Sequence, residues 1–443
     1  MTCLFGVDHL IMVSRMDMQV NRSFGWLSRL QTPVVLAYAA FVLIGVSLGA
    51  GGVLLPAQMN DYGVDRATIG ITFFTGSAGF VLASLSNGLL IRRLGVRISL
   101  AVGGGVYVLA SLCLAARPPF AAFVAVQLLT GYGTGVLESV LNTYLATLPN
   151  ATTLLNRLHA FFGVGALIGP AFAAWMVGFA PWTAVMLVLT VAGVPLVAGF
   201  LVAYPRALPA EPGAGSVEHG TVAGDSSGSG HLAAALRDPG VLCGAAMLLV
   251  YVGLEIGVSN WGFSYLVQAR GLSRALAGYS VSGFWLGLTA GRFLISPIAN
   301  RVGMSTGGMM YACLAGITAT ATLGWLSPTA AAASAALVAL GFFLGPVFPT
   351  TMAIAPQLTT PELAPTAIGV LNAGSTIGGA GLPWVAGAIA QATGIWTLMP
   401  YTVALAVVQI AVWRPLAARI KVAPAGPGTG PADPVGELSQ PVL

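Results

Sequence analysis

The sequence has 443 residues, of which 56% are hydrophobic and only 7% are charged, and its mean hydropathy is +0.87. A soluble domain contains about 25% charged residues, so this composition excludes a soluble globular fold and indicates a chain that lies mostly in a lipid bilayer. The net charge of +5 does not indicate nucleic-acid binding, because the basic residues border apolar segments instead of forming one patch.

The first half of the chain contains six apolar segments, each long enough to cross a membrane as a helix. A mixed stretch, residues 1–32, comes before them, and we expect it to be a cytoplasmic tail. We predict an N-terminal six-helix bundle over residues 33–204. Its expected spans are 34–57, 67–91, 98–116, 120–148, 154–179 and 183–204.

The second half begins after a stretch rich in Pro, Gly, Ser and Ala, residues 205–240, which has no apolar periodicity and is typical of a flexible linker. Six further apolar segments predict a second bundle over residues 241–416. A Pro/Gly-rich tail, 417–443, follows it and is expected to be disordered. The expected spans are 241–267, 277–298, 304–326, 329–355, 364–390 and 395–412.

The orientation in the membrane follows from the basic residues, which are enriched in cytoplasmic loops. If the N-terminus is cytoplasmic, 14 of the 18 Lys and Arg residues lie on the inner side and four on the outer side. We therefore expect a multi-pass protein of the cytoplasmic membrane with both termini and the linker inside the cell.

The two halves of the chain repeat one another at a nearly constant offset. The Gly131-Tyr-Gly-Thr-Gly135 segment matches Gly341-Phe-Phe-Leu-Gly345 at an offset of 210 residues, and Arg93-Leu-Gly95 matches Arg301-Val-Gly303 at 208. The third match joins Gly165 to Gly374 at 209 residues. Three matches in the same order predict an all-α integral membrane protein with 12 transmembrane helices in two six-helix pseudo-repeats, the architecture of secondary transporters.

The segment from 131 to 142 contains a carboxylate, Glu138, inside an apolar run. Gly131, Gly135, Glu138 and Asn142 are spaced by four, three and four residues, so they share one helical face. A buried carboxyl group can gain and lose a proton as its surroundings change, and ionisable residues inside membranes usually have a function. We predict that Glu138 and Glu255, the two acids deep within spans, couple transport to protons, although either could also serve only in helix packing.

Further candidate residues come from the polar and aromatic groups of the spans. Arg292 could pair with a carboxylate or extend to the membrane surface, and His159 could move protons or be an ordinary interfacial histidine. The tryptophans could instead be interfacial anchors. We predict that the substrate contacts are Glu138, Asn142, Tyr251, Glu255, Asn260, Trp261, Trp285 and Asn372.

Other classes of protein lack their motifs here. The only lysine, Lys421, is not part of a phosphate-binding loop, so an ATP-driven pump is excluded. The Gly45-Val-Ser47-Leu-Gly49 segment matches a nucleophile elbow but lies inside a span, which makes an enzyme improbable. The histidines and cysteines show no metal-ligand spacing, so we expect no metal and no cofactor. A membrane sensor on the same fold stays open.

The loop between the second and third spans resembles the signature loop of the major facilitator superfamily. It reads Gly88-Leu-Leu-Ile-Arg92-Arg93-Leu94-Gly95-Val96-Arg97, with Arg92 in place of the family's acidic residue; Asn300 takes that place in the second half. The resemblance covers essentially the whole membrane part of the chain. It implies gating roles on the inner side for Arg92, Arg93, Gly95, Arg97, His159, Arg292 and Arg301.

Within that superfamily, the stretch from Gly135 to Asn142 is similar to the fourth helix of the fucose-permease branch, where the Glu lines the sugar and proton site. The chain departs from that branch at Gly52, where the permease has an acidic residue. A weaker match to the drug-exporter branch runs from Gly165 to Pro170, with Gln127 in place of that branch's Arg. We therefore expect a monomeric secondary transporter of a small, sugar-like solute coupled to protons. The alternative is a proton-driven efflux antiporter.

Overall fold

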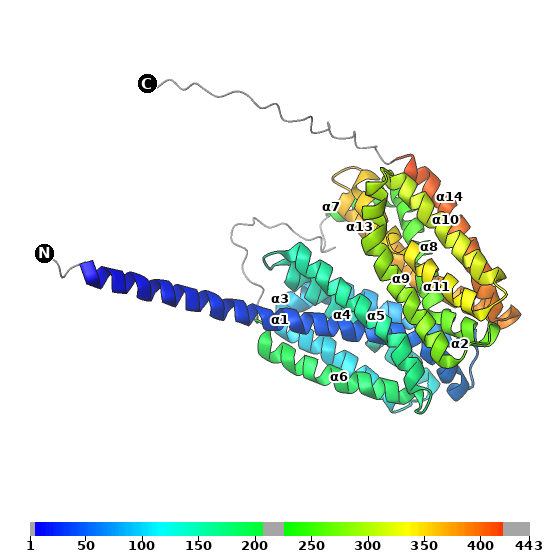
Figure 1. Ribbon diagram of the computed structural model, residues 1–443, viewed down its shortest axis with the longest axis horizontal. Coiled ribbons are helices and arrows are strands. Elements are labelled where there is room, and N and C mark those ends of the chain that lie inside the picture. The colour runs from blue at the N-terminus through cyan, green and yellow to red at the C-terminus, as the bar shows by residue number, and fades with distance from the viewer. Residues whose placement is uncertain (1–4, 207–225, 420–443) are drawn as a thin grey trace, which may run out of the picture.

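The structure is a computed structural model that describes residues 5–206 and 226–419, with side chains described from residue 32 and, after the gap, from residue 230. Its described part is helical throughout. The predicted C-terminal tail beyond residue 419 and most of the predicted linker lie outside the described residues. Figure 1 shows two groups of long helices, the N-terminal half and the C-terminal half, whose helices lie beside one another.

The N-terminal half contains six membrane spans. They are α1 (Phe5–Tyr62), the two arms of α3 (Ile71–Ala115), α4 (Phe120–Ala146), α5 (Ala151–Met176) and α6 (Trp182–Ala203), with the short α2 (Arg66–Ile69) between the first two. The arms of α3 meet at Gly95, whose φ of 75° and ψ of 169° are not helical. The helix α1 begins 27 residues before the apolar part at Thr32, inside the predicted tail. An existing helix extends easily because each added residue needs no new nucleus.

The C-terminal half also contains six spans. Three of them are single helices: α9 (Arg274–Arg301), α10 (Thr306–Leu326) and α13 (Ala364–Thr393). The other three combine several elements. They are α8 (Pro239–Ser264) with the π-helical turn η1 (Tyr265–Ala269), α11 (Ala330–Leu344) with α12 (Val347–Ile354) and η2 (Ala355–Gln357), and η3 (Ile395–Thr397) with α14 (Leu398–Ala417). Within the described chain, nine helical stretches are long and apolar enough to cross a membrane; one of them contains both arms of α3. With the more polar α9 and α13, the predicted twelve-helix architecture is confirmed.

Two features of this half were not predicted. The short helix α7 (Ser226–Ala235) lies inside the predicted linker. Its last residue, Ala235, is fully buried against Val241 and Ala367 of the C-terminal half, and this packing holds the helix in place. The tenth span, predicted as continuous over 329–355, is interrupted between α11 and α12. Pro346, which lacks a backbone N–H, stands at this interruption.

The helix crossings repeat between the halves, which gives the sequence repeat a physical cause. A β-carbon on Gly131 would collide with the carbonyl oxygen of Gly76, and one on Gly341 would collide with that of Phe284, in the equivalent place of the second half. Glycine is therefore required where these backbones touch. The same relation joins α5 to α1 and α13 to α8. Between α5 and α1, Gly165 faces the carbonyl of Val42 and Gly169 faces that of Val46. Between α13 and α8, Gly374 faces the carbonyl of Ala245 and Gly378 faces that of Leu249.

Candidate functional site

A cavity of about 400 Å³ lies between the two halves. Most of its wall comes from α1, α3 and α4 of the N-terminal half. The C-terminal half contributes Ile256 and Asn260 of α8 and Gly379 of α13. The volume lies within the range of about 300–1,000 Å³ that is usual for small-molecule sites.

Glu138 lines this cavity and is the only ionisable residue in its wall among those that the structure describes. The close contact of Gly131 with Gly76 brings α4 against α3, and the α4 face with Gln127, Thr134 and Glu138 then points into the cavity. Within the described residues, the Glu138 carboxylate has no hydrogen-bond donor and no cation within 4 Å. Its charge state therefore depends on solvent and on whatever occupies the cavity.

Neutral polar groups make up the rest of the cavity's hydrogen-bonding surface. The hydroxyl groups of Thr130 and Thr134 donate to carbonyls of α4, and that of Thr72 donates to the carbonyl of Ile69 at the end of α2, which leaves their oxygens as acceptors. The amides of Gln58, Gln127 and Asn260 form no side-chain hydrogen bond within the described part of the chain, so both their donors and acceptors are available. Three aromatic rings complete the wall: Phe73, Phe80 and Phe162.

A second charged group lies in the C-terminal half, outside the wall of that cavity. Glu255 of α8 is 8% exposed, and its Oε1 lies 3.8 Å from Nη2 of Arg292 on α9. The hydroxyl of Tyr251, one turn before Glu255, is buried without a hydrogen-bond partner among the described residues. The predicted proton-coupling acids are thus in different settings, one facing a cavity and one facing a cation.

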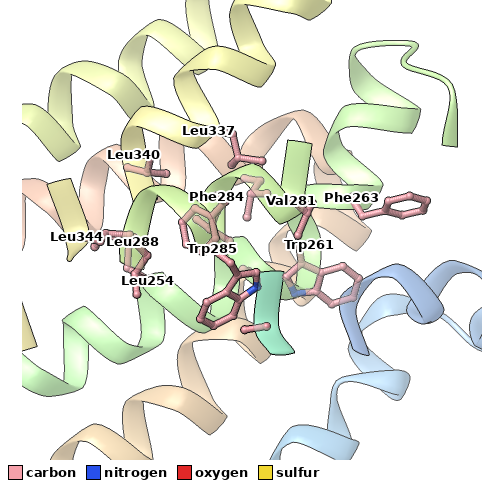
Figure 2. Packing of buried hydrophobic residues seen from close by; sticks show 14 of the residues in the cluster. Leu254, Trp261, Phe263, Val281, Phe284, Trp285, Leu288, Leu337, Leu340 and Leu344 are labelled. Atoms are coloured by element: carbon pink, nitrogen blue, oxygen red, sulfur yellow. The ribbon is translucent and has the colours of Figure 1, made fainter. Parts of the chain in front are cut away.

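Six predicted substrate contacts do not line the cavity in this conformation: Tyr251 and Glu255, described above, and four others. Trp261 and Trp285 lie in the buried cluster of the C-terminal half, at 0% and 2% exposure (Figure 2). The Trp261 indole donates to the Pro383 carbonyl. The side-chain amide of Asn142 donates to the backbone carbonyl of Glu138 at 2.8 Å, and Asn372 is exposed on α13.

The predicted inner-side residues fall into two groups. Gly95 and Gly303, the last residues of the repeated Arg-X-Gly motifs, both have positive φ, at 75° and 69°. Arg97 donates from Nε to the carbonyl of Tyr204 at 2.6 Å, which fastens the loop after Gly95 to the end of α6. The other group is exposed at the surface: Arg92, Arg93, His159, Arg292 and Arg301. His159 also packs its ring edge-on to Phe41, with the ring centroids 5.6 Å apart.

The halves are joined by hydrogen bonds at only one end of the molecule. Nη2 of Arg66 donates to Gln268 at 2.7 Å, the backbone N–H of Arg66 donates to Gln391 at 3.3 Å, and the indole of Trp384 donates to the Ala67 carbonyl at 3.0 Å. The fourth bond runs from the Ala171 N–H to the Ser282 hydroxyl at 3.1 Å. Among the described residues, no other side-chain hydrogen bond joins the halves. All four lie toward the end predicted to be extracellular.

Several cavity residues were absent from the predicted site. Gln127 is 11 residues before Glu138, so three helical turns place both on one face of α4, and this spacing could have identified it. Gln58 is a buried amide in the first span, an unusual residue for that position. The serine and threonine residues gave no comparable signal, since hydroxyl groups in membrane helices commonly bond to their own backbone.

A model of the Major Facilitator Superfamily matches residues 36–383 and 252–440 of the chain. In sequence, the chain is 26% identical over 394 residues to "Bypass of stop codon protein 6" of Saccharomyces cerevisiae, covering 82% of this chain and 78% of that protein. It is 25% identical over 293 residues to a "Glucose/galactose transporter" of Brucella abortus, covering 62% of this chain and 67% of that protein.

Solved structures give the same fold. The nucleoside transporter NupG, in a mutant form, aligns with a TM-score of 0.71 at 15% identity and covers 89% of this chain and 100% of its own. A bacterial homologue of the lysosomal transporter Spinster, in an inward-facing and unoccupied conformation, aligns at 0.71 and 12% identity over 88% and 97% of the two chains. The E. coli fucose:proton symporter FucP aligns at 0.58 and 16% identity over 88% and 99%. At these identities the likeness concerns the fold alone.

Proposed function

The chain belongs to the Major Facilitator Superfamily and is a multi-pass membrane transporter, and from this premise we propose that it moves a small, neutral, sugar-like solute by alternating access coupled to protons. The two bundles, residues 33–204 and 241–416, would rock about the cavity between them. Both termini would lie in the cytoplasm, and the protein would act as a monomer in the cell membrane.

The observation that supports this proposal most is the wall of the cavity. None of the described residues that line it is basic, so an anionic cargo would find no counter-charge among them. Three amides and several hydroxyl groups match the alternating donors and acceptors of a polyhydroxylated molecule, and aromatic rings suit its apolar faces. The name of one relative in sequence, a glucose/galactose transporter, agrees with this class of cargo.

Glu138 is the residue that we assign to proton coupling. When the cavity is closed to water, an unpaired carboxylate is costly, and protonation removes that cost. When the cavity opens to the cytoplasm, water stabilises the charged form and the proton can leave. Glu255 would take part from the second half, where Arg292 can stabilise its charge.

The four hydrogen bonds at one end correspond to one stage of this cycle. They hold together the ends of the halves that we assign to the extracellular side, so the cavity would communicate with the cytoplasm. Because the described residues contain no equivalent bonds at the other end, we infer an inward-open conformation. The inward-facing Spinster homologue is among the structures with the same fold.

The decisive experiment uses purified protein in proteoliposomes. A screen of neutral sugars and polyols by thermal stabilisation first identifies a ligand. The Glu138→Gln variant should then lose accumulation driven by a proton gradient while it keeps counterflow of that ligand. Glu362→Gln, which removes a carboxylate from an exposed loop, is the matched control and should behave as wild type.

Accumulation that survives in Glu138→Gln would refute the coupling assignment. The sign of the gradient separates the transport alternatives, because an efflux antiporter moves its cargo against the direction of proton entry. Ligand binding without any counterflow would instead indicate a sensor.

A further inference from the structure

The interruption of the tenth span opens a second pocket, of about 450 Å³, within the C-terminal half. The helix α11 ends at Leu344 and α12 begins at Val347. Pro346 and Pro349 line the pocket beside this interruption. The equivalent helix of the N-terminal half, α4, is unbroken from Phe120 to Ala146. The sequence repeat therefore does not account for the interruption beside which this pocket lies.

Six polar side chains line the pocket, and none of its lining residues is acidic. Three of them follow one face of α9 at intervals of four residues, and the others come from α10, α12 and η2. Such a convergence of four elements is typical of a ligand site rather than of helix packing. The six residues are Arg292, Ser296, Asn300, Thr306, Thr350 and Gln357.

Arg292 is the charged group of this pocket, and its hydrogen-bonding capacity is unused. Its only ion-pair contact within the described residues is Glu255, at 3.8 Å, which is too long for a hydrogen bond. Tyr251 and Glu255 face its guanidinium, but neither forms a well-aligned hydrogen bond with it within the described residues, although a guanidinium has five N–H donors. The side chain is 35% exposed, so a ligand in the pocket can reach it.

The neighbouring polar groups are equally available. The Ser296 hydroxyl has only the thioether sulfur of Met309 as a partner, 3.7 Å away, which is a weak interaction. Asn300, Thr306 and Thr350 make no side-chain hydrogen bond within the described chain. A ring of unpaired donors around one guanidinium suits a ligand with several acceptor oxygens and negative charge.

We propose that this pocket binds a phosphate group that enters from the side predicted to be cytoplasmic. The Arg292 guanidinium would hold two of its oxygens, and the hydroxyl groups of Thr306 and Thr350 would donate to the others. A carboxylate would use only the guanidinium, whereas a tetrahedral phosphate can use all of these donors. The volume leaves room for the rest of a phosphomonoester or for a lipid headgroup.

A bound phosphate would also compete with Glu255 for Arg292. This consequence rests on the proposed function, in which the Glu255 charge takes part in coupling. Occupancy of the pocket would then change transport from the cytoplasmic side without any contact with the cargo in the main cavity, which Arg292 does not line.

The test measures binding and needs no transport activity. Full-length protein is placed in nanodiscs of phosphatidylcholine, and its thermal unfolding is followed while inorganic phosphate is titrated against chloride at constant ionic strength. A saturable rise in the unfolding temperature is expected. Asn300→Asp places a negative charge in the lining of the pocket and should weaken phosphate binding by at least about tenfold, since like charges in one site repel each other.

The matched control is Asn156→Asp, the same change at an exposed position on the same side of the membrane. It should leave phosphate binding unchanged. A second arm uses nanodiscs that contain phosphatidic acid. If the headgroup already fills the pocket, added phosphate will raise the unfolding temperature no further, and Asn300→Asp will restore the phosphatidylcholine value.

No stabilisation by phosphate in phosphatidylcholine, together with no effect of Asn300→Asp in phosphatidic acid, would overturn the proposal. Equal weakening by Asn156→Asp would also overturn it, because the effect would then be one of general surface charge. Neither result bears on the cargo or on Glu138, so the proposed function would stand or fall separately.

Discussion

In the N-terminal half the fourth span is one continuous helix that presents Glu138 to the cavity, whereas the equivalent span of the C-terminal half is broken beside Pro346 and presents no charge. The acid of the C-terminal half is instead on α8 and faces Arg292. The two halves nevertheless cross their helices through glycines at equivalent positions. Backbone contacts have thus been kept while side-chain chemistry has diverged.

This difference indicates which features of the repeat are structural and which are functional. A crossing glycine tolerates no side chain in either half, because the carbonyl of the facing helix fills its space. A charged residue has no such restriction, so one half can contain the cavity acid and the other an ion pair. The comparison predicts symmetric effects of glycine substitutions and asymmetric effects of charge substitutions.

The largest expected effect comes from the crossing glycines. Gly131→Ala and Gly341→Ala should each destabilise the protein by about 3 kcal/mol, since the new methyl group would overlap a backbone oxygen that cannot move alone. Thermal unfolding in detergent measures the effect. Gly105→Ala is the control, because nothing lies within 4 Å of the added atom. A large loss in only one half would break the symmetry that we infer.

The charged residues should behave differently in the two halves. Glu255→Gln should cost about 1.5 kcal/mol, because it removes the counter-charge of Arg292 in a pair that is buried only on the Glu255 side. Glu138→Gln should change the free energy of unfolding by less than about 0.5 kcal/mol, since no described cation depends on that carboxylate. Chemical denaturation of both variants in the same detergent makes the comparison. Equal costs would mean that Glu138 has a partner in solution.

The outer ends of the halves provide a third comparison. Arg270 donates to the Tyr265 hydroxyl and to the carbonyls of Gly324 and Ser327, whereas the Arg117 side chain is 57% exposed and pairs with Asp61. Arg270→Ala should therefore cost about 1.5 kcal/mol because it removes these hydrogen bonds and leaves the Ser327 carbonyl without a side-chain donor. Arg117→Ala should cost about 0.5 kcal/mol, as exposed ion pairs do. Thermal unfolding decides the order, and the reverse order would contradict this interpretation.

The smallest expected effect concerns helix caps outside the membrane. Burial tends to raise the pKa of Asp238, but the hydrogen bond from the Gly240 N–H at the start of α8, the nearby Thr359 and the charge of Arg419 hold the pKa below its usual range. A lowered pKa stabilises the folded state above the unfolded value of about 3.9, and this stabilisation is lost as the pH falls through the folded value.

Asp238→Ala should thus cost about 1 kcal/mol at pH 7. The difference from wild type should shrink as the pH approaches 3, which unfolding curves over that pH range will show. In the N-terminal half, Asp65 caps only the four residues of α2 and is fully exposed, so Asp65→Ala should have a smaller effect. If the Asp238→Ala difference did not depend on pH, the cap would not act through its charge.

The sequence was sufficient for the number of spans because each apolar run is long and bounded by loops. It could not predict the interruption at Pro346. Pro56, Pro170 and Pro383 stand inside unbroken helices of the same protein, so a proline alone does not identify a break. Nor could it predict α7, whose docking depends on burial of Ala235 against distant residues.

The candidate site was predictable only in part. Glu138 and Asn260, whose roles in binding and coupling stay predictions, line the cavity, since polar residues inside spans are costly and tend to face polar space. Trp261 and Trp285 do not, because a large aromatic residue fits a core as well as a cavity and composition cannot separate the two. Gln58 was missed because its place in the wall depends on how α1 lies beside α4, which no periodicity within one helix can reveal.

The outer hydrogen bonds around Arg66 and Ala67 also set an energy scale for the cycle. Four hydrogen bonds of about 1 kcal/mol each amount to about 4 kcal/mol, which corresponds to a population ratio of about a thousand between the closed and parted extracellular ends. A solute that binds the parted conformation about 10⁴-fold more tightly changes a ratio of about 1,000:1 into about 1:10. The free energy that holds the extracellular ends together is thus small enough for the binding of one solute molecule to overcome it. A much larger one would keep the transporter in a single conformation and stop transport.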